Sequence, residues 1–124
     1  MALTYSSMLE LGTQMPNFEL ENTVNNEIFS SLYFNSTRPK LVMFICNHCP
    51  YVIHYHKELV KLSHDYKDHL DFVAISSNDI VNYPEDSPEK MKELAIELGF
   101  FFPYLYDVTQ GVAKSFKAAC TPEF

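Results

Sequence analysis

The sequence predicts a single α/β domain built around a partly parallel sheet. Two short apolar runs, at residues 41–45 and 72–76, are typical of strands buried inside such a sheet. Between them, apolar residues from Val52 onward recur every three or four positions, which indicates an amphipathic helix. Strand, helix and strand joined by short links favour a parallel pair. The 124 residues, 47% of them hydrophobic, suffice for one core.

The N-terminal part predicts a hairpin. Phe18 and Leu20 alternate with polar residues, and the pair Asn25 and Asn26 precedes a second short apolar stretch. Such a pair favours a tight turn between two strands. We expect a loop or a short helix over residues 30–39.

The strand at residues 41–45 is expected at the centre of the sheet, because five consecutive apolar residues fit burial on both faces. A helix then begins at Pro50, whose missing N–H costs nothing in a first turn, and continues to about Leu70. Its buried stripe is predicted to consist of Val52, Tyr55, Leu59, Leu62 and Tyr66. Its exposed face is predicted to carry His54, His56, His64 and His69.

The second half of the chain predicts a strand at residues 72–76, parallel to the first, and then a long polar loop over residues 78–87. A second helix follows, because Ser87 is a good N-cap, Pro88 suits the first turn and Gly99 stops the helix. Its buried residues are predicted to be Met91, Leu94, Ala95 and Leu98.

The last part of the chain predicts a return to the sheet. Pro103 confines any strand over residues 100–106 to an edge or a short piece. Residues 107–119 have the apolar spacing of a last helix.

The turn between the first buried strand and its helix carries Cys46 and Cys49 in a Cys-x-x-Cys spacing. Cys49 lies directly before Pro50, at a helix N-terminus whose free N–H groups and dipole favour an anionic, nucleophilic sulfur. His48 lies between the cysteines and either favours that anion when protonated or is a solvent-facing loop residue. Three cysteines are not a disulfide scaffold here, so redox chemistry or metal binding remain.

The net charge and the N-terminal sequence limit the kinds of partner and the location that we expect for this protein. The net charge of -7 argues against nucleic acid or an anionic membrane, which are bound through an excess of Lys and Arg. The first ten residues have no basic region and no apolar run suited to a signal peptide or a membrane helix. We therefore expect a cytoplasmic protein that acts on a small oxidant or on another protein.

Three motifs resemble the thioredoxin-like, peroxiredoxin-like family with the alkyl hydroperoxide reductase and thiol-specific antioxidant (AhpC/TSA) type of domain. They are residues 44–52, residues 78–79 with 83–88, and residues 119–122. The resemblance implies a thioredoxin-like sandwich and an antioxidant oxidoreductase that needs no organic cofactor. Its reductant would be a thioredoxin or a small thiol, and its substrate a peroxide or a protein disulfide.

The resemblance also implies a position for the C-terminal motif. In thioredoxin-like folds a Thr-Pro step, here Thr121 and Pro122, carries a cis-proline that faces the active cysteine. A pair of strands and a helix then follow in the family. We therefore expect residues 1–124 to be one C-terminally truncated domain, whose open sheet edge invites a homodimer.

Roles for the thiols follow from the same resemblance. The Cys49-Pro50 step matches the Cys-Pro of the peroxidatic cysteine, which implies Cys49 as nucleophile and Cys46 as resolving thiol. Peroxidases of the family add an arginine, and the one arginine here, Arg38, precedes the first buried strand. Peroxidase and disulfide oxidoreductase both stay open. Cys120 either comes within reach of the other thiols or is a small residue buried under the sheet.

Two functions other than thiol redox chemistry are also compatible with these residues. Cys46, Cys49 and a histidine would bind zinc or copper, as in a thioredoxin-like metal-binding module. A redox-inactive interaction domain is the third possibility. Asn78, Asp79 and Asp86 are expected to form capping and turn hydrogen bonds in the polar loop.

Overall fold

The computed structural model describes residues 4–34 and 37–124. Its centre is a five-stranded sheet in the order β2-β1-β5-β4-β3. The strands are β1 (Glu19–Asn22), β2 (Ile28–Ser30), β3 (Lys40–Phe44), β4 (Asp71–Ser76) and β5 (Tyr104–Tyr106). The strands β3, β4 and β5 run parallel, whereas β1 pairs antiparallel with both β2 and β5. The predicted α/β architecture with a partly parallel sheet is confirmed.

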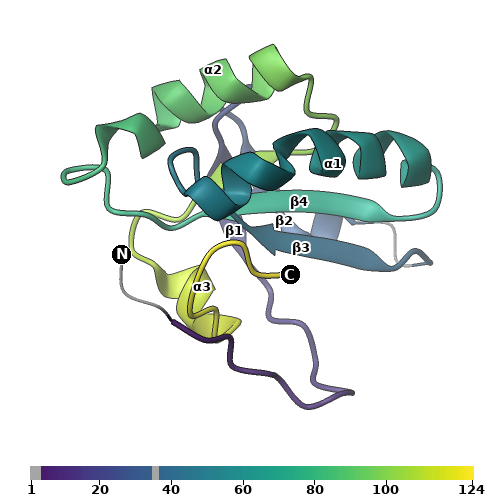
Figure 1. Cartoon of the computed structure of the whole chain (residues 1–124). Coiled ribbons are helices and arrows are strands. Elements are labelled where there is room, and N and C mark those ends of the chain that lie inside the picture. The colour runs from purple at the N-terminus through teal and green to yellow at the C-terminus, as the bar shows by residue number, and fades with distance from the viewer. Residues whose placement is uncertain (1–3, 35–36) are drawn as a thin grey trace.

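Helices cover both faces of this sheet. The helices are α1 (Pro50–Tyr66), α2 (Pro88–Leu98) and α3 (Gly111–Ser115), and two short 3₁₀ turns are η1 (Ser31–Tyr33) and η2 (Pro84–Asp86). The helices α1 and α2 lie over one face, and α3 lies on the other face with the C-terminal segment (Figure 1). None of the helices in the described ranges is long and apolar enough to cross a membrane.

Alternating side chains of the strands divide the core into two clusters. In β4, Phe72 and Ala74 belong to the cluster under α1 and α2, whereas Val73 and Ile75 belong to the cluster on the α3 side. The period of two is that of a strand buried on both faces. The sheet is therefore covered on both sides, and its strand ends are left to form a site.

Several local predictions are confirmed. The turn between β1 and β2 includes Asn26 in the left-handed region, with φ of 61°. Ser87 caps α2 by accepting a hydrogen bond from Lys90 N at 3.3 Å, and Gly99 ends it with φ of 71°. The strand after Pro103 is short, but it lies inside the sheet. The last helix covers less than the expected residues 107–119.

The prediction that the first buried strand is central was wrong. Among the described residues β3 is the last strand of the sheet and pairs along its length only with β4. Its other side carries an isolated antiparallel bridge, in which Phe44 and Glu123 exchange backbone hydrogen bonds of 2.7 and 3.0 Å. A run of apolar residues indicates that both faces of a strand are buried, but it does not indicate how many strands pair with that strand.

The predicted buried stripe of α1 was partly wrong, and the helix ends at Tyr66 rather than Leu70. Tyr55 and Tyr66 are exposed, while His56 and Ser63 are buried. The buried positions Val52, His56, Leu59 and Ser63 still follow helical spacing, so the helix is rotated slightly about its axis relative to the prediction. Tyrosine is amphipathic and fits either side of such a boundary. The exposure expected of the other histidines, His54, His64 and His69, is found.

The buried His56 predicts a pH dependence of stability. Its Nε2 has no hydrogen-bond partner among the described residues, and burial lowers the pKa of this imidazole below its ordinary value of 6.5. Just below pH 6.5, His56 binds a proton in the unfolded chain, whereas in the folded chain it stays neutral until the pH is lower. The free energy of unfolding should therefore fall as the pH falls, by up to about 1.4 kcal/mol per pH unit from this group. Urea unfolding of wild type and His56→Gln between pH 7.5 and 5 measures it.

The exposed His69 provides the matched control. His69→Gln should keep the wild-type slope of stability against pH, while His56→Gln flattens that slope. Equal slopes in all three proteins would show that His56 is not the titrating group.

Candidate active site

The two cysteines of the Cys-x-x-Cys spacing lie where β3 ends and α1 begins. Cys49 is the N-cap residue of α1, with Pro50 in the first turn, and its sulfur makes no capping hydrogen bond. Cys46 is fully buried, and Cys49 is 2% exposed. Both side chains therefore sit at the carboxyl end of a parallel strand, where open α/β sheets place their sites.

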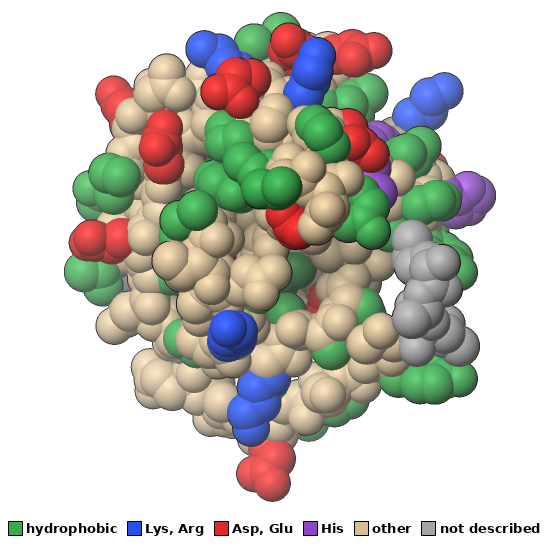
Figure 2. Space-filling view, turned by 90° about the vertical axis from the view of Figure 1, so that its left-hand side faces the viewer, with side chains coloured by type: hydrophobic (Ala, Val, Ile, Leu, Met, Phe, Trp, Pro, Cys, Tyr) green, Lys and Arg blue, Asp and Glu red, His purple; other side chains and the backbone are tan. Residues whose placement is uncertain are grey.

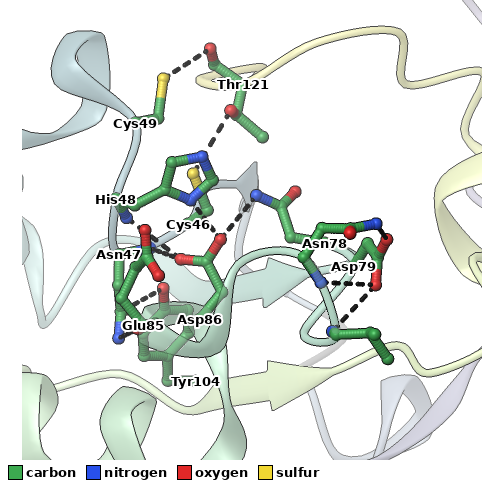
Figure 3. A network of polar contacts seen from close by, with 12 residues as sticks. Cys46, Asn47, His48, Cys49, Asn78, Asp79, Glu85, Asp86, Tyr104 and Thr121 are labelled. Atoms are coloured by element: carbon green, nitrogen blue, oxygen red, sulfur yellow. Dashed lines mark hydrogen bonds and ion pairs between the residues drawn. The ribbon is translucent and has the colours of Figure 1, made fainter.

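One residue of the C-terminal segment contacts both sulfurs. The Sγ of Cys49 donates to the backbone oxygen of Thr121 at 3.5 Å, and the Sγ of Cys46 lies 3.6 Å from the hydroxyl of Thr121 (Figure 3). The Thr121-Pro122 peptide bond is cis. The bridge between Phe44 and Glu123 holds this segment against the end of β3. The structure thus brings together the sequence-predicted residues Cys46, Cys49, Thr121 and Pro122.

The surroundings of Cys46 keep its sulfur protonated at neutral pH. Burial raises the pKa of the Cys46 thiol to about 11, the negative charge of Asp86 adds to the rise, and the hydrogen bond with Thr121 opposes it. Cys46 is therefore a thiol until another group takes its proton.

The turn between the two cysteines is held by Asp86, which is fully buried at the end of η2. Its Oδ1 accepts hydrogen bonds from the backbone N–H groups of Asn47 at 2.8 Å and His48 at 3.0 Å. Its Oδ2 accepts from the Asn78 amide at 2.9 Å and contacts Nδ1 of His48. Asp86 thus joins the cysteine turn to the loop that follows β4.

Asp86 is a site residue whose role was not predicted from the sequence. It was expected to cap its own loop, as Asp79 does by accepting from the backbone of Val81 and from Asn82. Instead it reaches residues 38 and 39 positions earlier in the chain. The available signals were its place directly before the N-cap Ser87 and its place in the motif at residues 83–88, and neither indicates a distant partner.

Neighbouring side chains fix the rest of this turn. The His48 ring stacks on Tyr83 with centroids 4.3 Å apart and planes at 6°. The Asn47 amide donates to the backbone oxygen of Glu85 at 2.9 Å and accepts from the Tyr104 hydroxyl at 2.9 Å. His48 is therefore placed by Asp86 and Tyr83, and is half-buried rather than solvent-facing.

A cleft of about 1070 Å³ opens beside the two cysteines. Figure 2 views the molecule from this end and shows a hollow near the middle of the face. The walls are the start of α1, the loop after β4, α3 and the C-terminal segment, and they include Cys46, His48, Cys49, Pro50, Cys120, Thr121 and Pro122. All the predicted site residues border this one cleft, which has room for a molecule larger than hydrogen peroxide.

Cys120 borders this cleft on the side of the C-terminal segment. It is half-buried, and its sulfur lies 3.5 Å from Oε2 of Glu123 and 3.6 Å from the hydroxyl of Ser6. Arg38 lies before the other end of β3, where its guanidinium is 3.8 Å from Asp71. The structure therefore places a third thiol at the cleft and the arginine away from it.

A group of metal-ligating atoms also lies here. Ligand atoms of Cys46, His48 and Asp86 lie within 4.8 Å of one another. The metal site expected from the sequence comprised Cys46, Cys49 and a histidine, whereas this group has Asp86 in the place of Cys49.

Known proteins resemble this chain both in sequence and in structure. The sequence profile of the AhpC/TSA family matches residues 11–123. An uncharacterized conserved protein from Geobacillus kaustophilus is 52% identical with a TM-score of 0.91, covering 94% of this chain and 62% of that one. A hypothetical protein from Sinorhizobium meliloti is 38% identical with a TM-score of 0.90, covering 94% and 64%. The chain thus spans less than two thirds of the length of either protein.

More distant similarity concerns the fold. A thiol-disulfide oxidoreductase from Bacteroides fragilis is 20% identical with a TM-score of 0.69, covering 89% of this chain and 79% of that one. No curated protein matches the chain.

Proposed function

This chain belongs to the AhpC/TSA family of thioredoxin-like proteins, and we propose that it is a thiol oxidoreductase in which Cys49 attacks the substrate and Cys46 resolves the product. The observation that carries the proposal is that both sulfurs contact Thr121. These contacts lie beside the cleft, where Cys49 begins α1. Free N–H groups and the helix dipole at that start favour the anionic sulfur that a nucleophile needs. Cys46, as a buried thiol, keeps a proton to give to a leaving group.

With a disulfide substrate the reaction is thiol exchange. The Cys49 thiolate attacks one substrate sulfur, the substrate S–S bond breaks, and the first thiolate leaves. Cys46 then loses its proton to the leaving group and attacks the Cys49 sulfur of the mixed disulfide. The substrate has then gained two electrons and leaves as one thiol and one thiolate, which takes a proton from water, and Cys46 and Cys49 remain as a disulfide. A thioredoxin or a small thiol would return the two electrons.

With a peroxide ROOH the same residues would act in two steps. The Cys49 thiolate attacks the terminal oxygen, the O–O bond breaks, and an alcohol ROH leaves after taking up a proton. Cys49 is then a sulfenic acid, which condenses with the Cys46 thiol to give the disulfide and water. Two electrons again pass from the two cysteines to the substrate.

Two features of the residues that the structure describes favour disulfide exchange over peroxide reduction. Arg38 lies before the opposite end of β3, so it does not stabilise a leaving oxygen at the thiols. The cleft of about 1070 Å³ has room for a substrate much larger than hydrogen peroxide. We therefore place peroxides second.

Trapping reaction intermediates tests the proposal. Cys46→Ser, incubated with a small aromatic disulfide, should accumulate a mixed disulfide at Cys49 that peptide mass spectrometry locates. The same variant treated with hydrogen peroxide and dimedone should give a much slower sulfenic acid adduct at Cys49. Faster trapping with peroxide would reverse the order of the two substrates.

Two variants serve as controls for this trapping. Cys120→Ser should release the aromatic thiol as wild type does and should form no lasting adduct. Cys49→Ser should form no adduct at Cys46. A stable adduct at Cys46 in Cys49→Ser, with none at Cys49 in Cys46→Ser, would reverse the assigned roles.

A further inference from the structure

We propose that Cys46, His48 and Asp86 form a zinc site in the reduced protein. The sulfur, a ring nitrogen and a carboxylate oxygen of these residues lie within 4.8 Å of one another. These three atom types are those that Zn²⁺ binds in proteins, at about 2.3 Å for sulfur and about 2.0–2.2 Å for nitrogen and oxygen. Zinc binding itself does not rest on the proposed redox function, but its consequence for the thiols does.

The charges at this place favour a cation. Asp86 is fully buried, and its partners are two backbone N–H groups, the Asn78 amide and the His48 ring. A buried carboxylate is costly unless it is paired or bound to a metal. Cys46 is buried beside it, and a second negative charge on its sulfur would add repulsion. One divalent cation compensates both the carboxylate and a thiolate.

The geometry needs only a local adjustment. Tetrahedral zinc separates its ligand atoms by roughly 3.3–3.7 Å, so the widest present separation must close by roughly 1 Å. His48 is the ligand able to move, because it is half-buried in a loop between Asp86 and Tyr83. Its contact with Asp86 would open so that both atoms turn to the ion, while the backbone hydrogen bonds to Oδ1 hold the carboxylate in place.

The ligand set selects zinc among common ions. Ca²⁺ and Mg²⁺ prefer six or more oxygen ligands, and Cu(I) prefers sulfur. Cys46 is buried, but the half-buried His48 borders the cleft, so an ion has a path to enter past His48 and its fourth position would face the cleft. Three protein ligands with one open position are a usual zinc arrangement.

Zinc at this place would control the thiols. Binding displaces the Cys46 proton and holds the sulfur on the metal, so Cys46 cannot attack the mixed disulfide at Cys49. Conversely, once zinc-free protein has formed the disulfide between Cys46 and Cys49, the sulfur ligand is lost and the oxidised protein cannot bind zinc. The site would thus hold the protein inactive until zinc is removed.

Anaerobic titration of the reduced chain with ZnSO₄, followed by calorimetry against a competing chelator, tests the site. We expect one zinc per chain, and an affinity at least about 100-fold lower in Cys46→Ser, His48→Gln and Asp86→Asn, since even outer-shell partners alter metal affinity 10–100-fold. Cys49→Ser and Cys120→Ser should bind as wild type does. Circular dichroism of each variant identifies any that fail to fold, and His48→Gln, altered at a half-buried side chain, serves as the conservative test.

Cobalt provides a second readout that does not depend on affinity. Co²⁺ in the reduced wild type should show a sulfur-to-metal charge-transfer band and the strong visible bands of tetrahedral coordination, and Cys46→Ser should lose the first. Wild-type zinc affinity in folded His48→Gln, or loss of binding in Cys49→Ser equal to that in Cys46→Ser, would overturn the site. Trapping of Cys49 adducts in zinc-free protein is independent of this result, so the two proposals fail separately.

Discussion

Replacing Cys49 with serine is expected to reduce the rate of disulfide reduction by about 10³-fold or more, to the background level. The expected loss follows from removing the only sulfur that we place at the start of α1, because a serine hydroxyl is not ionised there and is a far weaker nucleophile. The side chains differ by one atom, so the fold should be retained. Release of an aromatic thiol from its disulfide, followed by absorbance under excess reductant, measures the rate.

Two further variants distinguish this result from a general disturbance of the site. Cys120→Ser should retain activity within about twofold, since its sulfur contacts Glu123 and Ser6 rather than the turn of residues 46–49. In the absence of reductant, Cys46→Ser should release one equivalent of thiol at the normal rate and then stop. Activity in Cys49→Ser, with loss in Cys120→Ser, would move the nucleophile to the C-terminal segment.

Replacing Asp86 with alanine is expected to lower the free energy of unfolding by about 3–5 kcal/mol. The substitution leaves the backbone N–H groups of Asn47 and His48 and the Asn78 amide without their acceptor in a buried place. A buried donor left unpaired costs about 1–3 kcal/mol, and several are affected at once. Urea unfolding followed by circular dichroism at neutral pH measures the loss.

Asp79 provides a matched control in the same loop. It is exposed, and it accepts hydrogen bonds from its near neighbours Val81 and Asn82. Asp79→Ala should cost about 1 kcal/mol or less, because water replaces the lost acceptor. An Asp86→Ala protein no less stable than Asp79→Ala would show that the buried carboxylate does not hold the cysteine turn.

The fold could be predicted from the sequence wherever its signals are local. The apolar runs gave β3 and β4, and the cap Ser87, Pro88 and Gly99 gave the bounds of α2. The edge position of β3 could not be predicted, because it depends on which strands pair with it and not on its own residues. The burial of His56 was missed because a polar ring within an apolar stripe carries no signal for burial.

In the candidate site, too, the residues with local signals could be predicted and those with distant partners could not. Cys46 and Cys49 follow from their spacing at a strand-to-helix turn, and Thr121 and Pro122 followed from the family resemblance. Asp86 was assigned to its loop because its partners lie far away in the chain. A hydrogen bond between distant loops depends on how the sheet is assembled, and a single sequence contains no pattern for it.

Mapping the disulfide in the oxidised chain tests the central assignment most directly. Reduced protein is oxidised with one equivalent of a disulfide, the remaining thiols are alkylated, and the linked peptides are identified by mass spectrometry without reduction. We predict a Cys46–Cys49 link with Cys120 alkylated. A Cys49–Cys120 link with Cys46 alkylated would contradict the account, because the resolving sulfur would then belong to the C-terminal segment.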